Sequence, residues 1–398
     1  MTDPSSARAD ASATRGLASL CGASIASSYY VQPLLVAISA SFGLGGAQVG
    51  LIPMIGQIAI GLGVLLLVPL GDVVDNRRMV AACIAGQIAS MLLVAWSSSF
   101  TGFLLASSAL GLLTIAPYLI PAYASRFTAP SERGRVTGSI VQGFILGILF
   151  ARTFGGIVGA YAGWRVVYFV AAIATLLLLL KQARRMPHAA PPPAVAYREL
   201  LASLPVLLCK EPVLRRAALT QALMFGTFGS LWIALSLHIQ SDAFGLSSAT
   251  VGLFGLLGLV SATVAPRVGK LIDRFGQDIV TRFGIALTIA AWAVMRVFGH
   301  SLPALALGVV LLDIGASSVH IAKQSALLTI GGVQRSRMVT VYIVGQYIGG
   351  GLLAALTGLA WSQGGWRAVC FIGIATVSVA LIVNSLPGRG NERRSAPH

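Results

Sequence analysis

The chain has 398 residues, of which 56% are hydrophobic and 10% are charged. Because a soluble domain carries about 25% charged residues, this composition excludes a soluble protein and indicates an integral membrane protein. The formal net charge of +16 does not indicate a nucleic-acid partner, because the basic residues are distributed as in a membrane protein.

Twelve apolar runs follow one another along the chain. A helix that spans a bilayer needs about 20 apolar residues, and each run must be helical because lipid cannot satisfy exposed backbone groups. The spans are predicted at roughly 17–38, 49–70, 79–96, 100–124, 137–160, 164–181, 217–239, 248–268, 279–298, 302–329, 339–361 and 366–386.

The longest polar connection separates the sixth span from the seventh. It predicts an N-terminal six-helix half at 1–181, a cytoplasmic linker at 182–216 and a C-terminal six-helix half at 217–398. Within the linker, residues 197–208 have the amphipathic character of a helix that lies in the membrane interface.

Basic residues gather in alternate loops and in the two tails. All but five of the 28 lysines and arginines lie there, and the exceptions are Arg152, Arg165, Arg296, Lys323 and Arg367. Since cytoplasmic loops carry the excess of positive residues, we expect both tails and the linker to be cytoplasmic. Both termini on one side require an even number of spans.

Two charged turns of similar sequence join apolar runs in the two halves. The glycine would let two helices pack closely, and the aspartate would sit against a neighbouring helix N-terminus, which favours an anion. We expect these turns to form a cytoplasmic gate. Their main residues are Gly71, Asp75, Arg77 and Arg78 in the first copy, and Gly269, Asp273, Arg274 and Gly276 in the second.

Two further stretches are repeated about half a chain apart. Gly163-Trp164-Arg165 returns 202 residues later as Gly365-Trp366-Arg367, and Arg133 and Arg135 return at the same distance as Arg335 and Arg337. All the repeats run in the same direction, so the sequence predicts an all-α membrane protein of twelve transmembrane helices in two parallel six-helix repeats.

One acidic residue lies deep inside an apolar run. Asp313 stands near the middle of 302–329, where a carboxylate costs a few kcal/mol and burial favours its neutral form. Such a group can take up and release a proton. His320 and Gln324 follow at near-helical spacing on one polar face, and His320 is the second candidate for proton coupling. The alternative is a structural carboxylate satisfied by a neighbouring helix.

One basic residue also lies well inside a run. Arg152, in 137–160, is a candidate anchor for an anion or a charged partner for a carboxylate, which would be Asp313 if the two helices approach each other. Alternatively its side chain snorkels along the helix toward the headgroups.

The twelve spans, the parallel halves, the basic central loop and the G-x-x-x-D-R-x-G turn resemble the major facilitator superfamily. The stretch Tyr29–Leu35 resembles the YYNQPLLP motif of a bacterial drug and sugar efflux-like branch, with Val31 in place of asparagine.

The superfamily's antiporter motif is matched at Gly134, Gly143 and Gly147. The sequence departs from this motif at Ile148 and at Ala151-Arg152. In that family the first, fourth, seventh and tenth spans line a cavity, which implies substrate contacts for Tyr30, Gln32, Tyr118, Trp232 and Gln324.

Together these features predict a secondary active transporter, with efflux of a small organic or amphipathic molecule by proton antiport as the leading version. Proton-coupled uptake of a metabolite is the nearest alternative, and a membrane-embedded enzyme and a channel are rivals from other classes. We expect no enzymatic activity, no cofactor beyond the proton gradient and no metal, because no ATP-binding, nucleophile or metal motif occurs. We expect a monomer in the bacterial inner membrane whose partners are lipid, protons and the substrate.

The topology gives a direct prediction. A reporter that is active only in the cytoplasm should be active when fused at residue 190 and at the C-terminus. A periplasmic reporter that is active at residue 190 would contradict the orientation.

Overall fold

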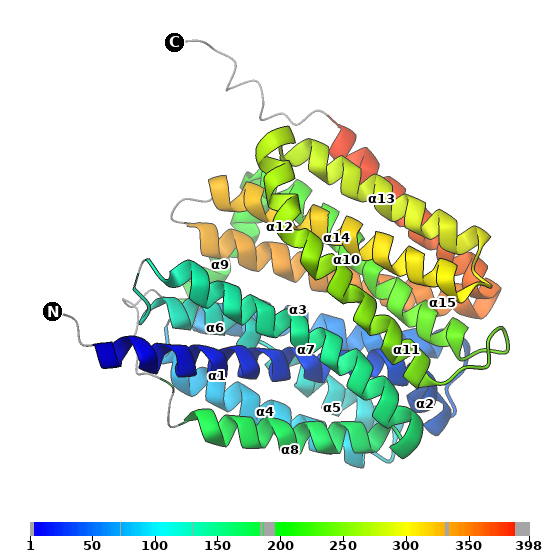
Figure 1. Ribbon diagram of the computed structural model, residues 1–398, viewed down its shortest axis with the longest axis horizontal. Helices are drawn as coiled ribbons and strands as arrows, with labels where there is room; N and C mark the ends of the chain where they lie inside the picture. The colour runs from blue at the N-terminus through cyan, green and yellow to red at the C-terminus, as the bar shows by residue number, and fades with distance from the viewer. Residues whose placement is uncertain are drawn as a thin grey trace, which may run out of the picture. The chain divides into compact units, whose positions relative to one another are not determined.

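The computed structural model describes residues 4–71, 73–129, 131–183, 186, 196–330 and 334–386. These residues form helices joined by short connections and contain no strand (Figure 1). The predicted linker lies partly outside the described residues. Its described part includes the predicted amphipathic helix, α9, at Tyr197–Lys210.

Every predicted span coincides with helix. The first half contains α1 (Pro4–Tyr29), α2 (Val31–Ser41), the 3-10 helix η1 (Gly46–Gly50), α3 (Leu51–Leu70), α4 (Asn76–Trp96), α5 (Phe100–Leu113), α6 (Ala116–Ser125), α7 (Arg133–Ala162) and α8 (Trp164–Ala183). After α9 come α10 (Pro212–Ile239), α11 (Ser248–Phe254), the 3-10 helix η2 (Gly255–Leu257), α12 (Gly258–Phe275), α13 (Gln277–Val297), α14 (Leu302–Ile330) and α15 (Arg335–Ser385). Ten helical segments of the described chain are long and apolar enough to cross a membrane.

Five predicted spans are not single regular helices. The first breaks between α1 and α2 and the fourth between α5 and α6, where Pro33 and Pro117 lack the N–H that would bond to the carbonyl four residues earlier. The eighth passes through η2 between α11 and α12. The last two spans form one continuous run, α15, which is kinked by non-helical backbone at Gly364 and Gly365.

The chain forms two compact units that exchange one segment each. Unit 1 comprises Met1–Gly43, Leu62–Tyr197 and Ser247–Gly255, and unit 2 comprises Leu44–Gly61, Arg198–Leu246 and Leu256–His398. Thus the start of the second span belongs to the unit of the C-terminal half. The start of the eighth belongs to the unit of the N-terminal half.

Glycines bring equivalent helices together in each unit. In unit 1, a Cβ on Gly22 of α1 would lie 2.7 Å from the carbonyl oxygen of Gly143 on α7, and Gly147 packs against Gly22 in turn. In unit 2, a Cβ on Gly349 of α15 would lie 2.5 Å from the carbonyl oxygen of Ala222 on α10. Gly349 follows Gly147 by 202 residues, so the sequence repeat is also a repeat of packing.

The exchanged segments make a second pair of glycine contacts. In unit 1, a Cβ on Gly156 of α7 would lie 2.7 Å from the Cα of Gly252 on α11. In unit 2, a Cβ on Gly358 of α15 would lie 2.7 Å from the Cα of Gly50 in η1. Gly358 follows Gly156 by 202 residues, and Gly252 follows Gly50 by the same interval. These two contacts are therefore equivalent, and a search of the sequence for glycines 202 residues apart would have found their members.

The Gly-Trp-Arg stretches have the same local structure. Gly163 and Gly365 adopt φ angles of 86° and 57°, which favour glycine. Each is followed by a buried tryptophan whose indole N–H is bonded at 2.9 Å, Trp164 to Ser41 Oγ and Trp366 to the carbonyl oxygen of Met295. The repeated arginines likewise begin equivalent helices, α7 at Arg133 and α15 at Arg335.

The glycine contacts predict a difference between two substitutions on α7. Gly147→Leu should lower the unfolding temperature of the purified protein, because it forces α1 and α7 apart and overpacking costs about 1–3 kcal/mol. Gly138→Leu should leave that temperature nearly unchanged, because the described chain has no atom within 4 Å of a Cβ there. Equal unfolding temperatures for both variants would contradict the packing argument.

Candidate functional site

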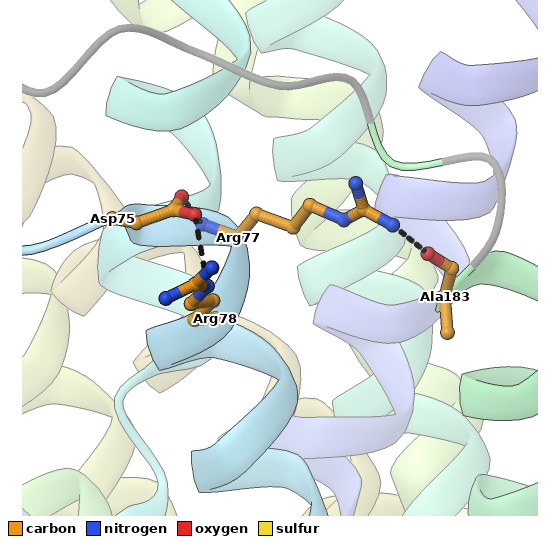
Figure 2. Close-up of polar contacts among 4 residues, drawn as sticks. All are labelled: Asp75, Arg77, Arg78 and Ala183. Atoms are coloured by element: carbon orange, nitrogen blue, oxygen red, sulfur yellow. Dashed lines mark hydrogen bonds and ion pairs between the residues drawn. The ribbon is translucent and has the colours of Figure 1, made fainter.

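The first charged turn caps a helix. Asp75 is the N-cap of α4, and its Oδ1 accepts a hydrogen bond from the backbone N–H of Arg77 at 2.9 Å (Figure 2). Asp75 therefore meets a helix N-terminus, that of the helix it precedes. Its ion pair with Arg78, 3.7 Å from Nε to Oδ2, is worth little because the Arg78 side chain is exposed.

Arg77 joins two helix ends in unit 1. Its guanidinium donates at 2.7 Å to the carbonyl oxygen of Ala183, the last residue of α8 (Figure 2). A cation at a helix C-terminus satisfies a carbonyl and is favoured by the helix dipole. Gly71 packs closely, since a Cβ there would lie 2.6 Å from Leu119 Cδ2 on α6.

The second charged turn differs in structure despite its sequence. Asp273 and Arg274 lie in the last turn of α12, which continues to Phe275 and ends at Gly276 with φ 83°. Asp273 is exposed and has no hydrogen bond or ion pair to another described residue. Gly269 has no described atom within 4 Å of a Cβ position, so the expected glycine packing is found at Gly71 and not here.

Arg152 is buried inside unit 1. It is 2% exposed, its Nε donates to Gln32 Oε1 at 2.8 Å, and its guanidinium carbon lies 5.6 Å from the centroid of the Tyr29 ring. A snorkelling side chain would be exposed, so that alternative does not describe this structure. Arg152 instead connects α7 to the first span on either side of its break.

Two of the proposed cavity residues of unit 1 are packed against protein. Tyr30 is 4% exposed and contacts the rings of Phe154 and Tyr168 edge-on, at centroid distances of 6.1 and 6.0 Å. Gln32 is 7% exposed and bonded to Arg152. The third, Tyr118 on α6, is half-buried.

A buried amide network in unit 1 was not predicted from the sequence. Gln87 on α4 donates to Thr114 Oγ1 at 2.8 Å and to Ser27 Oγ at 3.2 Å, and accepts from Ser24 Oγ at 2.8 Å. Its side-chain donors and acceptor are thus satisfied by α1 and by Thr114, which follows α5. The signal was available, because a glutamine inside the apolar run 79–96 is expected to bond across helices.

Asp313 lies inside unit 2 on α14 and is 5% exposed. Farther along α14, the Nδ1 of His320 lies 3.1 Å from the hydroxyl of Tyr342 on α15. Tyr342 is fully buried, and sequence analysis missed it. Gln324 is half-buried one turn beyond His320. Arg152 and Asp313 belong to different units, and their pairing stays a prediction.

The last proposed cavity residue lies on α10. Trp232 is fully buried and its ring lies 6.4 Å from that of Phe228. Together with Tyr30 and Gln32, it shows that most of these side chains pack against protein in this structure.

The cap geometry yields a prediction for the first charged turn. Asp75→Asn keeps an N-cap of equal quality but removes the charge, so it should lower transport and leave the unfolding temperature unchanged. Asp75→Ala should lower both, with the lost cap costing about 1 kcal/mol. Wild-type transport by Asp75→Asn in proteoliposomes would show that the charge does not matter.

Comparisons with known proteins agree with this architecture. The sequence profile of the Major Facilitator Superfamily matches this chain twice, at residues 17–218 and at residues 217–396. The chain is 33% identical over 363 residues to YgaY of Escherichia coli, described as an uncharacterized transporter, covering 91% of this chain and 92% of that one. It is 33% identical over 360 residues to a probable transporter of Streptomyces coelicolor, covering 89% and 83%.

Solved structures share the fold at low sequence identity. A bacterial homologue of the human lysosomal transporter Spinster superposes with a TM-score of 0.75 at 16% identity, covering 97% of this chain and 96% of that one. The nucleoside transporter NupG superposes with a TM-score of 0.75 at 15% identity, covering 93% and 98%. The chain is therefore an integral membrane transporter that belongs to the Major Facilitator Superfamily.

Proposed function

We propose that this transporter exports a small organic molecule by proton antiport. The observation that carries the proposal is the burial of Asp313 in the middle of a membrane-spanning helix. A carboxyl group in such a place is expensive to keep ionised, so its protonation state depends on whether water can reach it. A change of access from one side to the other can then load and unload a proton.

His320 and Tyr342 support a proton site on α14. The imidazole lies two helical turns from Asp313 on the same helix and is held by the Tyr342 hydroxyl. This contact fixes the orientation of an imidazole, whose two ring nitrogens can accept and donate a proton. We propose Asp313 as the coupling carboxylate and His320 as a second group through which the proton passes.

The paired glycine contacts support a mechanism of alternating access. Contacts between glycines consist largely of van der Waals packing, which is short-ranged. Separating Gly50 from Gly358, or Gly156 from Gly252, therefore exposes few polar groups. In unit 1 the separation would also release two hydrogen bonds, from Ser248 Oγ to the carbonyl oxygen of Gly156 at 3.0 Å and from Thr153 Oγ1 to the carbonyl oxygen of Gly252 at 3.2 Å. We propose that these contacts open and close once in each transport cycle.

The cellular setting is part of the proposal. The alternation of basic residues along the chain supports both termini in the cytoplasm of a bacterial cell and a location in the inner membrane. A monomer suffices, because both repeats are present in one chain. Efflux is favoured over uptake by the resemblance of Tyr29–Leu35 to the efflux-like branch.

The proposal predicts how neutralising Asp313 separates two kinds of transport. Asp313→Asn should abolish accumulation driven by a pH gradient across proteoliposomes, because no proton is carried. It should retain counterflow exchange of substrate, which needs no net proton movement. Asp242→Asn, in the exposed loop between α10 and α11, is the matched control and should behave as wild type. Gradient-driven accumulation by Asp313→Asn would exclude this carboxylate as the essential proton carrier.

A further inference from the structure

Three glutamines of unit 2 gather around one stretch of α15. Gln221 on α10 donates from Nε2 to Gln346 Oε1 on α15 at 2.9 Å. Gln57 comes from the exchanged part of α3, and its Cδ lies 3.8 Å from the position of a Cβ on Gly350 of α15. Gly350 lies one turn beyond Gln346, so one stretch of α15 meets all three amides.

An aromatic side chain completes this cluster. Phe225 lies one turn beyond Gln221 on α10, and its ring comes within 3.1 Å of the same Cβ position on Gly350. The ring meets Tyr347 edge-on at a centroid distance of 5.4 Å. Neither Phe225 nor Gln57 is fully covered, since both side chains are half-buried. None of these side chains carries a charge.

Two of the three amides have an oxygen without a donor. Gln57 Oε1 and Gln221 Oε1 are buried and have no hydrogen-bond partner among the described residues, and Gln221 as a whole is 4% exposed. Leaving a buried acceptor unsatisfied is unfavourable, and each such group in a native structure calls for a physical explanation. The buried Gln87 of unit 1, by contrast, has its amide oxygen and nitrogen bonded on all sides.

We propose that the oxygens of Gln57 and Gln221 form a binding subsite for a neutral aromatic molecule that carries N–H or O–H donors. The donors of the ligand would satisfy the two oxygens, and its ring would pack against Phe225. The absence of charge in the cluster favours a neutral ligand over an anion or a cation. The subsite gives the substrate class of the transporter proposed above and rests on that function.

Glycine at position 350 fits this role. Any larger residue there would press on both the Phe225 ring and the Gln57 amide, and so would fill the place where this ring and this amide come together. Gln346 supports the site as a positioning residue, because its oxygen accepts the Gln221 N–H and thereby fixes which way the free Gln221 oxygen points.

The test is equilibrium binding of two matched probes to the purified full-length protein in detergent. The probes are 6-aminoquinoline, which has an aromatic ring and an N–H donor group, and 6-methylquinoline, which has the same size without the donors. Calorimetric titration should give a dissociation constant at least about tenfold lower for the amino compound, because a site with orphaned acceptors rejects a ligand that cannot donate. Equal dissociation constants would overturn the proposal.

The variants assign the effect to the two oxygens. Gln57→Leu and Gln221→Leu should each remove most of the tenfold preference, whereas Gln363→Leu, the same change at an exposed site, should keep it. Gln57→Leu should unfold at the same temperature as wild type or higher, because it removes an unsatisfied buried acceptor. If Gln57→Leu and Gln221→Leu both fold and keep the full preference, the subsite lies elsewhere and the proposal is wrong.

These measurements separate the subsite from the transport mechanism. Binding in detergent needs no proton gradient, so a donor preference without gradient-driven transport would contradict the antiport proposal alone. Gradient-driven transport without a donor preference would contradict the subsite alone.

Discussion

Close contact between helix backbones is the constraint on which the rest of this structure depends. Lipid tails are as apolar as the side chains they cover, so helices in a membrane gain little from the hydrophobic effect when they associate. They associate where small residues let them approach. Here Gly143 and Gly147 place α7 against α1, and Gly349 places α15 against α10. Gly147 and Gly349 lie 202 positions apart, so equivalent glycines bring the helices into contact in both units.

Close contacts between glycines also occur where a segment is exchanged between the units. Gly50 meets Gly358 in unit 2, and Gly156 meets Gly252 in unit 1, each joining the start of a span from one half of the sequence to a helix of the other half. Contacts of this kind can be strong in packing and still separate without leaving many polar groups unsatisfied. That combination supports the proposed change between two states of access.

Polar groups are treated differently in the two units. In unit 1, Gln87 is enclosed by hydroxyl partners, and such a satisfied network stabilises one arrangement of helices. In unit 2, Gln57 and Gln221 keep oxygens without donors among the described residues, and Asp313 lies buried on α14. Unit 1 also buries a charge, that of Arg152, but bonds it to Gln32. The unsatisfied amide oxygens of unit 2 are the groups on which the proposed ligand subsite rests.

The helices, the direction of the repeat and the buried position of Asp313 could be predicted from the sequence, because composition, periodicity and spacing can all be read along the chain. The sequence did not predict which side chains contact each other across helices. That Arg152 binds Gln32 and that Tyr342 holds His320 depend on which helix faces cross, and apolar spans of similar composition do not specify that. The two charged turns also differ in a way that their similar sequences do not predict. Asp75 caps the N-terminus of α4, whereas Asp273 lies in the last turn of α12.

The most direct test of this account measures proton movement by the wild-type protein. Proteoliposomes that contain a trapped pH-sensitive dye and no imposed gradient would be exposed to members of a compound panel, and the internal pH would be followed as each compound enters. The account predicts that entry of a transported compound drives protons out, so that the internal pH rises, and that Asp313→Asn abolishes this signal. Entry of the compound without any change in internal pH, or with a fall, would contradict proton antiport.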